Sequence, residues 1–206
     1  MILIEGIAVD DCTVHGIRNE LIEANTYVIA SAAQQSAIVV DPGSDYDTLN
    51  ILLEKLNVKK LIVFLTHGHF DHVIGVSKLA EYEPNVYLSN EDVGHLKKNN
   101  FYLRALKHEY RCETFEFTDF SEFRNDVFID VKVHEAPGHT SGSRIFEIGN
   151  CFFTGDTLYA NRVFSPTVQG SDIEIQSKSI KSIFHNCSGN SILIPGHGRT
   201  TTFENA

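Results

Sequence analysis

The chain has 206 residues, carries 17 Lys and Arg against 27 Asp and Glu for a formal net charge of −10, and is 42% hydrophobic. This length and apolar content exclude a disordered chain, and the acidity argues against nucleic-acid binding. No apolar run reaches the roughly 18–20 residues of a membrane span. We therefore expect a single domain over residues 1–206 that contacts neither a membrane nor nucleic acid.

The first 80 residues predict alternating strands and helices. Residues 21–29 and 36–40 are β-branched and apolar, with turn-forming residues between them. A helix is expected after Ser44, a good N-cap residue, because apolar residues follow it at helical spacing. The unbroken apolar run at residues 61–65 suits a strand buried on both faces, and a second helix is expected at 73–80.

The rest of the chain predicts further strands and two helices. The expected elements are a strand at 86–88, a helix at 91–99, an irregular insertion up to 123, a half-buried strand at 127–133, a hairpin at 144–154, a helix at 173–184 and a strand at 191–194. This order allows two packed sheets with helices outside, although periodicity alone does not distinguish that fold from a three-layer α/β arrangement.

The N-terminus and the cysteines point to the cytoplasm. Residues 1–16 lack a basic stretch followed by a long apolar run, so no signal peptide is evident. The four cysteines, Cys12, Cys112, Cys151 and Cys187, lie far apart and form no CxxC motif. Such spacing is typical of reduced thiols in a reducing compartment.

The strongest chemical signal directly follows the apolar run at 61–65. There the pattern His67-x-His69-x-Asp71-His72 places three imidazoles and a carboxylate within six residues. Imidazole and carboxylate ligands suit zinc, iron or manganese rather than calcium. His67 and His69 can face one ion while Asp71 and His72 turn toward another, so one segment can serve two ions.

Four more residues with metal-binding side chains follow expected strands or lie just beyond them: Asp41, His139, Asp156 and His197. Each is a weak signal alone, because a single His in a turn is more often a surface residue and Asp156 could cap a helix. Loops at neighbouring strand ends come together in folded proteins, and binding sites are built there. We therefore expect these residues to join the His67–His72 cluster.

Five motifs now appear in one order: DPG at 41–43, THGHFDH at 66–72, PGHT at 137–140, TGDTL at 154–158 and PGHG at 195–198. Together they resemble the metallo-β-lactamase superfamily, and most of all its small glyoxalase II-like hydrolases. The resemblance covers residues 23–197 and is specific for the fold and the metal site, and much less so for the substrate. It implies an α/β fold, the four-layer αββα sandwich.

The resemblance also implies a role for each motif residue. His67, His69 and His139 match the ligands of a first metal, Asp71, His72 and His197 match those of a second, and Asp156 matches the carboxylate that bridges both. Asp41 resembles a residue that supports the metal loop without binding metal. The expected cofactors are two divalent ions, with zinc as the first choice and iron or manganese as alternatives.

The implied activity is a binuclear metal-dependent hydrolase in which a metal-bridged hydroxide cleaves a small thioester or ester. Two metals about 3.5–4 Å apart can hold a hydroxide and polarise a carbonyl oxygen. Asp71 and Tyr159 are the candidate catalytic residues, and Tyr159 could donate a hydrogen bond to the substrate. Arg162 could pair with a substrate carboxylate, and Phe164 is a third candidate pocket residue. The expected partner is a small-molecule substrate, and a homodimer is an open possibility.

Two departures from the glyoxalase II pattern keep alternatives open. Those enzymes carry an added helical domain that helps to bind glutathione, whereas only eight residues follow Gly198 here. The aromatic, proline-bearing run after residue 158 is closer to lactonase-like members. A mono-iron persulfide dioxygenase-like oxidoreductase would use only His67, His139 and Asp156. A nuclease-type phosphodiesterase would need a basic surface, which the net charge does not favour.

The remaining residues of interest lie outside these motifs. Structural roles are expected for the other five histidines, His15, His95, His108, His134 and His185. A surface helix with an aromatic stripe toward the core is expected for the insertion that contains Phe101, Tyr102, Leu103 and Tyr110, and a lid or a subunit contact is the alternative. Whether residues 159–172 close over the substrate is left open.

Overall fold

The computed structural model describes residues 2–160, 171–185 and 187–205, and its strands form two sheets. The seven-stranded sheet has the order β1-β2-β3-β4-β5-β6-β7, and the five-stranded sheet has the order β12-β11-β10-β9-β8. The strands are β1 (Ile2–Val9), β2 (Cys12–Arg18), β3 (Asn25–Ser31), β4 (Ser36–Val40), β5 (Lys60–Phe64), β6 (Asn85–Leu88), β7 (Thr118–Asp119), β8 (Lys132–Glu135), β9 (Arg144–Ile148), β10 (Cys151–Gly155), β11 (Ile192–Pro195) and β12 (Thr201–Thr202).

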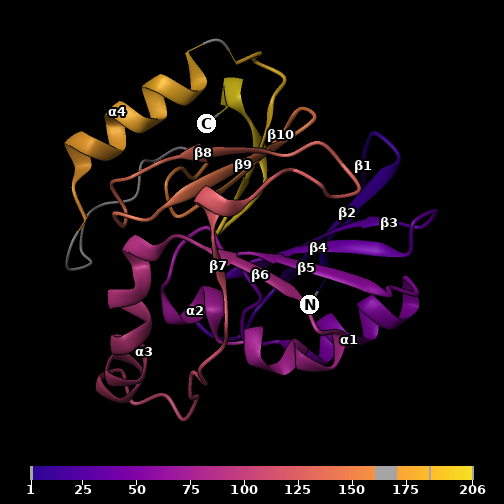
Figure 1. The fold of residues 1–206 in the computed structure, drawn as a ribbon. Helices are drawn as coiled ribbons and strands as arrows, with labels where there is room; N and C mark the ends of the chain where they lie inside the picture. The colour runs from indigo at the N-terminus through magenta and orange to yellow at the C-terminus, as the bar shows by residue number, and fades with distance from the viewer. Residues whose placement is uncertain (1, 161–170, 186, 206) are drawn as a thin grey trace.

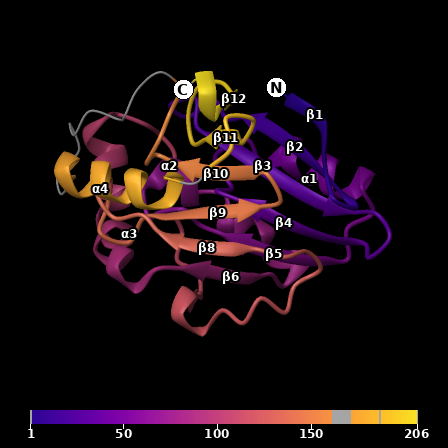
Figure 2. The same cartoon turned by 90° about the horizontal axis from the view of Figure 1, so that it is seen from above.

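Helices cover the outer faces of both sheets. The α-helices are α1 (Tyr46–Lys55), α2 (Phe70–Val73), α3 (Val93–Ala105) and α4 (Ile173–Phe184), and short 3₁₀ helices are η1 (Val76–Tyr82), η2 (Asn90–Asp92), η3 (Phe120–Glu122) and η4 (Phe203–Asn205). Helices α1, α2 and α3 lie on the side of the seven-stranded sheet, and α4 lies over the five-stranded sheet (Figure 1). Seen from above, the strands of one sheet overlie those of the other (Figure 2). The expected αββα sandwich is confirmed.

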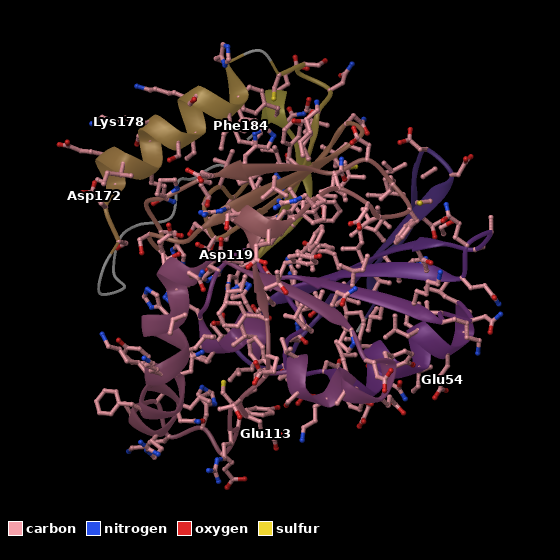
Figure 3. The ribbon with its side chains drawn as sticks, viewed as in Figure 1. Glu54, Glu113, Asp119, Asp172, Lys178 and Phe184 are labelled. Carbon is pink, nitrogen blue, oxygen red and sulfur yellow. The ribbon has the colours of Figure 1, made fainter. Side chains whose placement is uncertain are left out.

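Three apolar layers hold this sandwich together. Phe64, Phe146 and Phe153 are fully buried between the sheets, and the ring centroids of Phe64 and Phe146 are 5.1 Å apart. Leu53 packs from α1 onto the outer face of the first sheet, and Phe184 packs from α4 onto the second. In Figure 3, Phe184 and the solvent-exposed Lys178 mark the two sides of α4. Burial of each of these apolar side chains stabilises the folded state by about 1.5–3 kcal/mol.

Loops from the two sheets meet at one edge of the sandwich. The amide of Arg144 donates to the Thr66 carbonyl at 2.8 Å, and the amide of Asn25 donates to the Gly196 carbonyl at 2.7 Å. These bonds join the loop after β5 to the start of β9, and β3 to the loop after β11. The polar motifs predicted at strand ends are therefore brought into one region.

Most of the elements expected from the sequence are present. Strand β4, the β9–β10 hairpin, α4 and β11 match the expected positions within one or two residues. The expected strand at 21–29 begins only at Asn25, because Ile22 and Glu23 have φ angles of 53° and 54°, which a strand cannot contain. Ser44 does not cap α1 as expected, since its hydroxyl accepts from the Leu21 amide at 3.1 Å and Asp45 occupies the N-cap position.

Two further expectations were wrong in part. The expected helix at 73–80 is two pieces, α2 and η1, separated at Gly75. Gly75 donates its amide to the Pro42 carbonyl at 2.9 Å, and a Cβ there would collide with the Gly43 carbonyl. The expected strand at 127–133 is a strand only from Lys132 onward. Upstream, the Asn125 side chain accepts from the Val131 amide at 3.1 Å and so replaces strand pairing.

No helix in the described part of the chain is long and apolar enough to cross a membrane.

Candidate metal centre

The first ligand group lies between the loop after β5 and the loop that joins β8 to β9. Nε2 of His67 is 3.0 Å from Nδ1 of His69, and Nε2 of His139 is 3.0 Å from the same His69 nitrogen. All three side chains are buried. Nitrogens bound tetrahedrally at 2.0–2.1 Å from zinc are about 3.3–3.4 Å apart. The three nitrogens therefore face one point at nearly the spacing of a metal site.

The second ligand group combines α2 with the loop after β11. Nε2 of His72 is 3.3 Å from Nε2 of His197, and Oδ2 of Asp71 is 3.2 Å from the same His197 nitrogen. His72 Nε2 and Asp71 Oδ2 are 3.4 Å apart. Asn25 fixes the His197 loop from the side of β3, because its Nδ2 donates to the carbonyls of Pro195 and Gly198 at 3.0 Å each.

Asp156 lies between the two groups. Its Oδ1 is 3.4 Å from His72 Nε2, and its Oδ2 is 3.6 Å from Nε2 of both His139 and His197. Oδ1 is buried and has no hydrogen-bond partner among the described residues. A buried carboxylate oxygen without a hydrogen-bond donor has a lone pair free to bind a cation. This donor set of imidazoles and carboxylates fits two divalent ions with Asp156 as the bridge.

Asp41 supports the centre from behind. Its Oδ2 is 2.9 Å from Nδ1 of His72, the ring nitrogen that faces away from His197. Thr66 donates its amide to Oδ1 at 2.7 Å and its hydroxyl to Oδ2 at 2.6 Å. A third set of close donors consists of Asp41, His67 and His72. We do not assign a metal to it, because the Asp41 carboxylate already accepts hydrogen bonds from Thr66 and is paired with Nδ1 of His72. Asp41 therefore orients His72 so that Nε2 faces the second group.

We expect Asp41→Asn to weaken metal binding at the second group by about 10–100-fold, the usual cost of losing a carboxylate behind a histidine ligand. Binding at the first group should weaken less, because Asp41 reaches it only through the Thr66 hydroxyl, which is 3.0 Å from Nδ1 of His67. Competition titration with a chromophoric chelator separates the two affinities. Asp47→Asn on the exposed side of α1 serves as the control. Equal weakening of both sites would contradict this role.

The first group is poised to accept a metal at neutral pH. Burial and the neighbouring histidines hold the pKa of His67 well below its usual value. Burial and the neighbouring His139 lower the pKa of His69 to about 3, and burial also lowers the pKa of His139. All three imidazoles are therefore neutral at pH 7, with lone pairs available for a cation.

The second group holds a proton that a cation would displace. Burial opposes the charged form of His72, but the carboxylates of Asp71, Asp156 and Asp41 outweigh it and raise the His72 pKa well above its usual value. Burial likewise opposes ionisation of Asp71, yet the adjacent His72 and His197 hold its pKa well below the usual range. Metal binding here therefore releases a proton, whereas binding at the first group does not.

Asp92 is a positioning residue that no motif marked. It is fully buried at the end of η2, and its carboxylate accepts from the Gly68 amide at 2.7 Å, the Thr140 hydroxyl at 2.9 Å and the Gly142 amide at 2.9 Å. It thus ties the loop of His67 and His69 to the loop of His139. In the sequence, its only signal is a place at a helix start, which any capping Asp shares.

His95 also lies at the centre, although no motif contains it. It is in the first turn of α3, and its ring centroid is 4.8 Å from that of His69 in an edge-to-face contact. No residue that the structure describes is within hydrogen-bond reach of its ring nitrogens. The other histidines without a motif make contacts elsewhere; His134, for example, pairs with Glu147 of β9 at 2.8 Å.

The candidate pocket residues are only partly described. The Tyr159 ring lies 6.2 Å from that of His197, and its side chain is 8% exposed. Burial and the adjacent Asp156 carboxylate raise the pKa of Tyr159 well above its usual value, so its hydroxyl is protonated at neutral pH. Arg162 and Phe164, together with most of the 159–172 segment, lie outside the described residues.

Comparison with known proteins gives matches over nearly the whole chain. Residues 21–197 match the family model described as the metallo-beta-lactamase superfamily. The probable polyketide biosynthesis zinc-dependent hydrolase BaeB of Bacillus velezensis is 30% identical over 173 residues, covering 83% of this chain and 71% of that protein. Hydroxyacylglutathione hydrolase GloC of Haemophilus influenzae is 26% identical over 184 residues, covering 82% and 83%.

Solved structures share the fold. TTHA1623 in a di-iron-bound form superposes with a TM-score of 0.80 at 24% identity, covering 92% of this chain and 94% of that one. ETHE1 from Myxococcus xanthus superposes with a TM-score of 0.70 at 21% identity, covering 93% and 80%.

Proposed function

The chain belongs to the metallo-β-lactamase superfamily, and from this premise we propose that it is a binuclear metal-dependent hydrolase that cleaves a small thioester or ester. One observation carries the proposal. Asp156 lies between two sets of converging donors, with an oxygen within 3.6 Å of a histidine nitrogen of each set. An activity that needs a single metal would not require His72 and His197 to converge with Asp71.

In the proposed reaction, bound ions would activate water and the carbonyl, and the side chains of the two ligand groups would hold the ions. Bound divalent ions would supply a hydroxide at neutral pH and polarise the scissile carbonyl. His67, His69 and His139 would hold the first ion through neutral nitrogens, and Asp156 would fix its distance from the second. We propose zinc for both sites, in line with the zinc dependence in the name of BaeB, while the di-iron form of TTHA1623 keeps iron as an alternative.

We propose Asp71 as the residue that moves the proton. Its Oδ2 is 3.2 Å from His197 Nε2 and 3.4 Å from His72 Nε2, at the edge of the second group. A carboxylate at that position can take the proton of the attacking water and return it to the leaving group. No cysteine is a candidate nucleophile, because none lies in either ligand group and burial raises the pKa of Cys151 to about 11.

Tyr159 is the candidate hydrogen-bond donor to the substrate carbonyl, which esters, lactones and thioesters all contain. Its protonated hydroxyl, close to Asp156, can donate to the carbonyl oxygen as negative charge develops there. We expect Tyr159→Phe to lower kcat about tenfold with unchanged metal content, because the ions would also stabilise that charge. Steady-state kinetics on an acyl thioester and a lactone measure the effect. Tyr46→Phe is the matched control on α1. An unchanged kcat in Tyr159→Phe would show that the Tyr159 hydroxyl takes no part in the reaction.

The experiment for the function itself is a hydrolysis screen. Zinc-loaded protein should cleave members of a panel of acyl thioesters, aryl esters and lactones, and a chelator should stop the reaction. The four free cysteines and the acidic composition support a small-molecule substrate in a reducing compartment such as the cytoplasm. Failure on the whole panel by fully metal-loaded protein would contradict the proposal.

A further inference from the structure

Helix α4 begins against the loop that carries His139. The amide of Asp172, at the start of the helix (Figure 3), donates to the Gly138 carbonyl at 2.7 Å. One turn later the helix touches the same loop again, so closely that a Cβ on Gly138 would collide with the backbone of Gln176. The first turns of α4 therefore hold the His139 loop in place.

The side chain of Gln176 joins the same helix to the loop of Asp156. Its Nε2 donates to the Thr157 carbonyl at 2.8 Å and lies 3.4 Å from the carbonyl oxygen of Asp156 itself. The two ligands meet on the other side of these loops, where Oδ2 of Asp156 is 3.6 Å from Nε2 of His139. Gln176 thus contacts one ligand loop with its backbone and the other with its amide.

The two ends of the Gln176 amide differ in their contacts. The side chain is fully buried, and Oε1 accepts no hydrogen bond from any residue that the structure describes. A buried acceptor without a donor destabilises a fold, and this cost offsets what the bond to Thr157 contributes. Gln176 therefore adds little net stability, and the main effect of its amide is on where the Asp156 loop lies.

We propose that Gln176 is a positioning residue of the metal centre, which sets the spacing between His139 in the first ligand group and Asp156 between the two groups. This inference rests on the proposed function, because a centre of two ions is what the spacing serves. Asp92 has the matching role toward α3, where it ties the loop after β5 to the His139 loop. Gln176 acts through the main chain of its two loops.

Cobalt titration of Gln176→Met tests this role without a substrate. Methionine has a similar length but no donor for the Thr157 carbonyl. Cobalt binds imidazole and carboxylate ligands, and its visible absorption bands report the arrangement of those ligands. We expect about tenfold weaker cobalt binding and altered bands, as when other groups behind metal ligands are lost. The melting temperature of the metal-free protein should change by less than about 4 °C.

Ser179→Ala is the matched control on the same helix. The Ser179 hydroxyl donates to the Pro137 carbonyl at 2.8 Å and, within α4, lies 3.2 Å from the Ile175 carbonyl oxygen. None of its described hydrogen bonds reaches the loop of Asp156, and the bond from Asp172 still holds the His139 loop. This variant should match the wild type in cobalt affinity and in its absorption bands.

Cobalt binding by Gln176→Met at wild-type affinity and with wild-type bands would overturn the inference, and so would equal losses in Ser179→Ala. If circular dichroism shows that Gln176→Met does not fold, Gln176→Leu is measured in its place against the same outcomes. Hydrolysis plays no part in these measurements, so a failed substrate screen would contradict the proposed function alone. Unchanged cobalt binding in the variant, beside two ions and hydrolysis in the wild type, would contradict this inference alone.

Discussion

Asp156→Asn should lower hydrolysis by about 10³-fold and leave close to one metal per chain instead of two. The amide keeps the size of the side chain but removes the negative charge between the two ligand groups, where His72, His139 and His197 all approach it. A metal contributes several kcal/mol of transition-state stabilisation, and each 1.36 kcal/mol is a factor of ten in rate. Steady-state kinetics and elemental analysis on the same sample measure both effects.

Asp126→Asn is the control for this variant, since Asp126 is exposed and lies outside both ligand groups. It should keep full activity and both ions. If Asp156→Asn binds two ions and retains more than about a tenth of the wild-type rate, Asp156 does not bridge the centre. If the variant fails to fold, circular dichroism will report it, and Asp156→Glu, which keeps the charge, then tests the bridge.

Removing the metals should abolish activity and lower the melting temperature by about 8–16 °C. The ligands come from loops of both sheets, so bound ions would cross-link the sandwich at the edge where those loops meet. Binding at 1,000 times the dissociation constant stabilises a fold by about 4.1 kcal/mol, and 1 kcal/mol shifts the melting temperature by about 2–4 °C at this size.

Thermal melts in chelator and after zinc is restored measure this shift. Both the activity and the melting temperature should recover on adding zinc. His69→Ala should show a smaller chelator effect than wild type, because one of its two ligand groups is already incomplete. A melting temperature that does not respond to the chelator, in protein shown to have lost its metal, would contradict the role of the ions as cross-links.

The sequence predicts the ligand loops well because their signal is local. His67, His69, Asp71 and His72 lie within six residues directly after a buried strand, and that strand, β5, is present one residue from its expected position. The layered fold followed from five motifs in a family order. Single residues such as Asp156 became informative only through that order, because an isolated Asp is common in turns and at helix starts of every kind of protein.

Tertiary packing determines the positions of the site residues and element breaks that the sequence did not predict. Asp92 and His95 reach the centre because α3 packs on Gly68, and no spacing in the sequence encodes which loop a helix will meet. The break at Gly75 depends on a contact with the Pro42 carbonyl, 33 residues earlier in the chain. The irregular segment before β8 depends on one side chain, Asn125, which takes over a backbone hydrogen bond.

The most direct test of the two-metal centre is the metal content of protein purified without added metal, measured together with oxygen uptake on a persulfide. We predict about two ions per chain and no oxygen uptake, because both ligand groups are complete in the structure. About one iron per chain with oxygen consumption would contradict it. That result would assign the chain to the mono-iron dioxygenase class, with His67, His139 and Asp156 as the ligands.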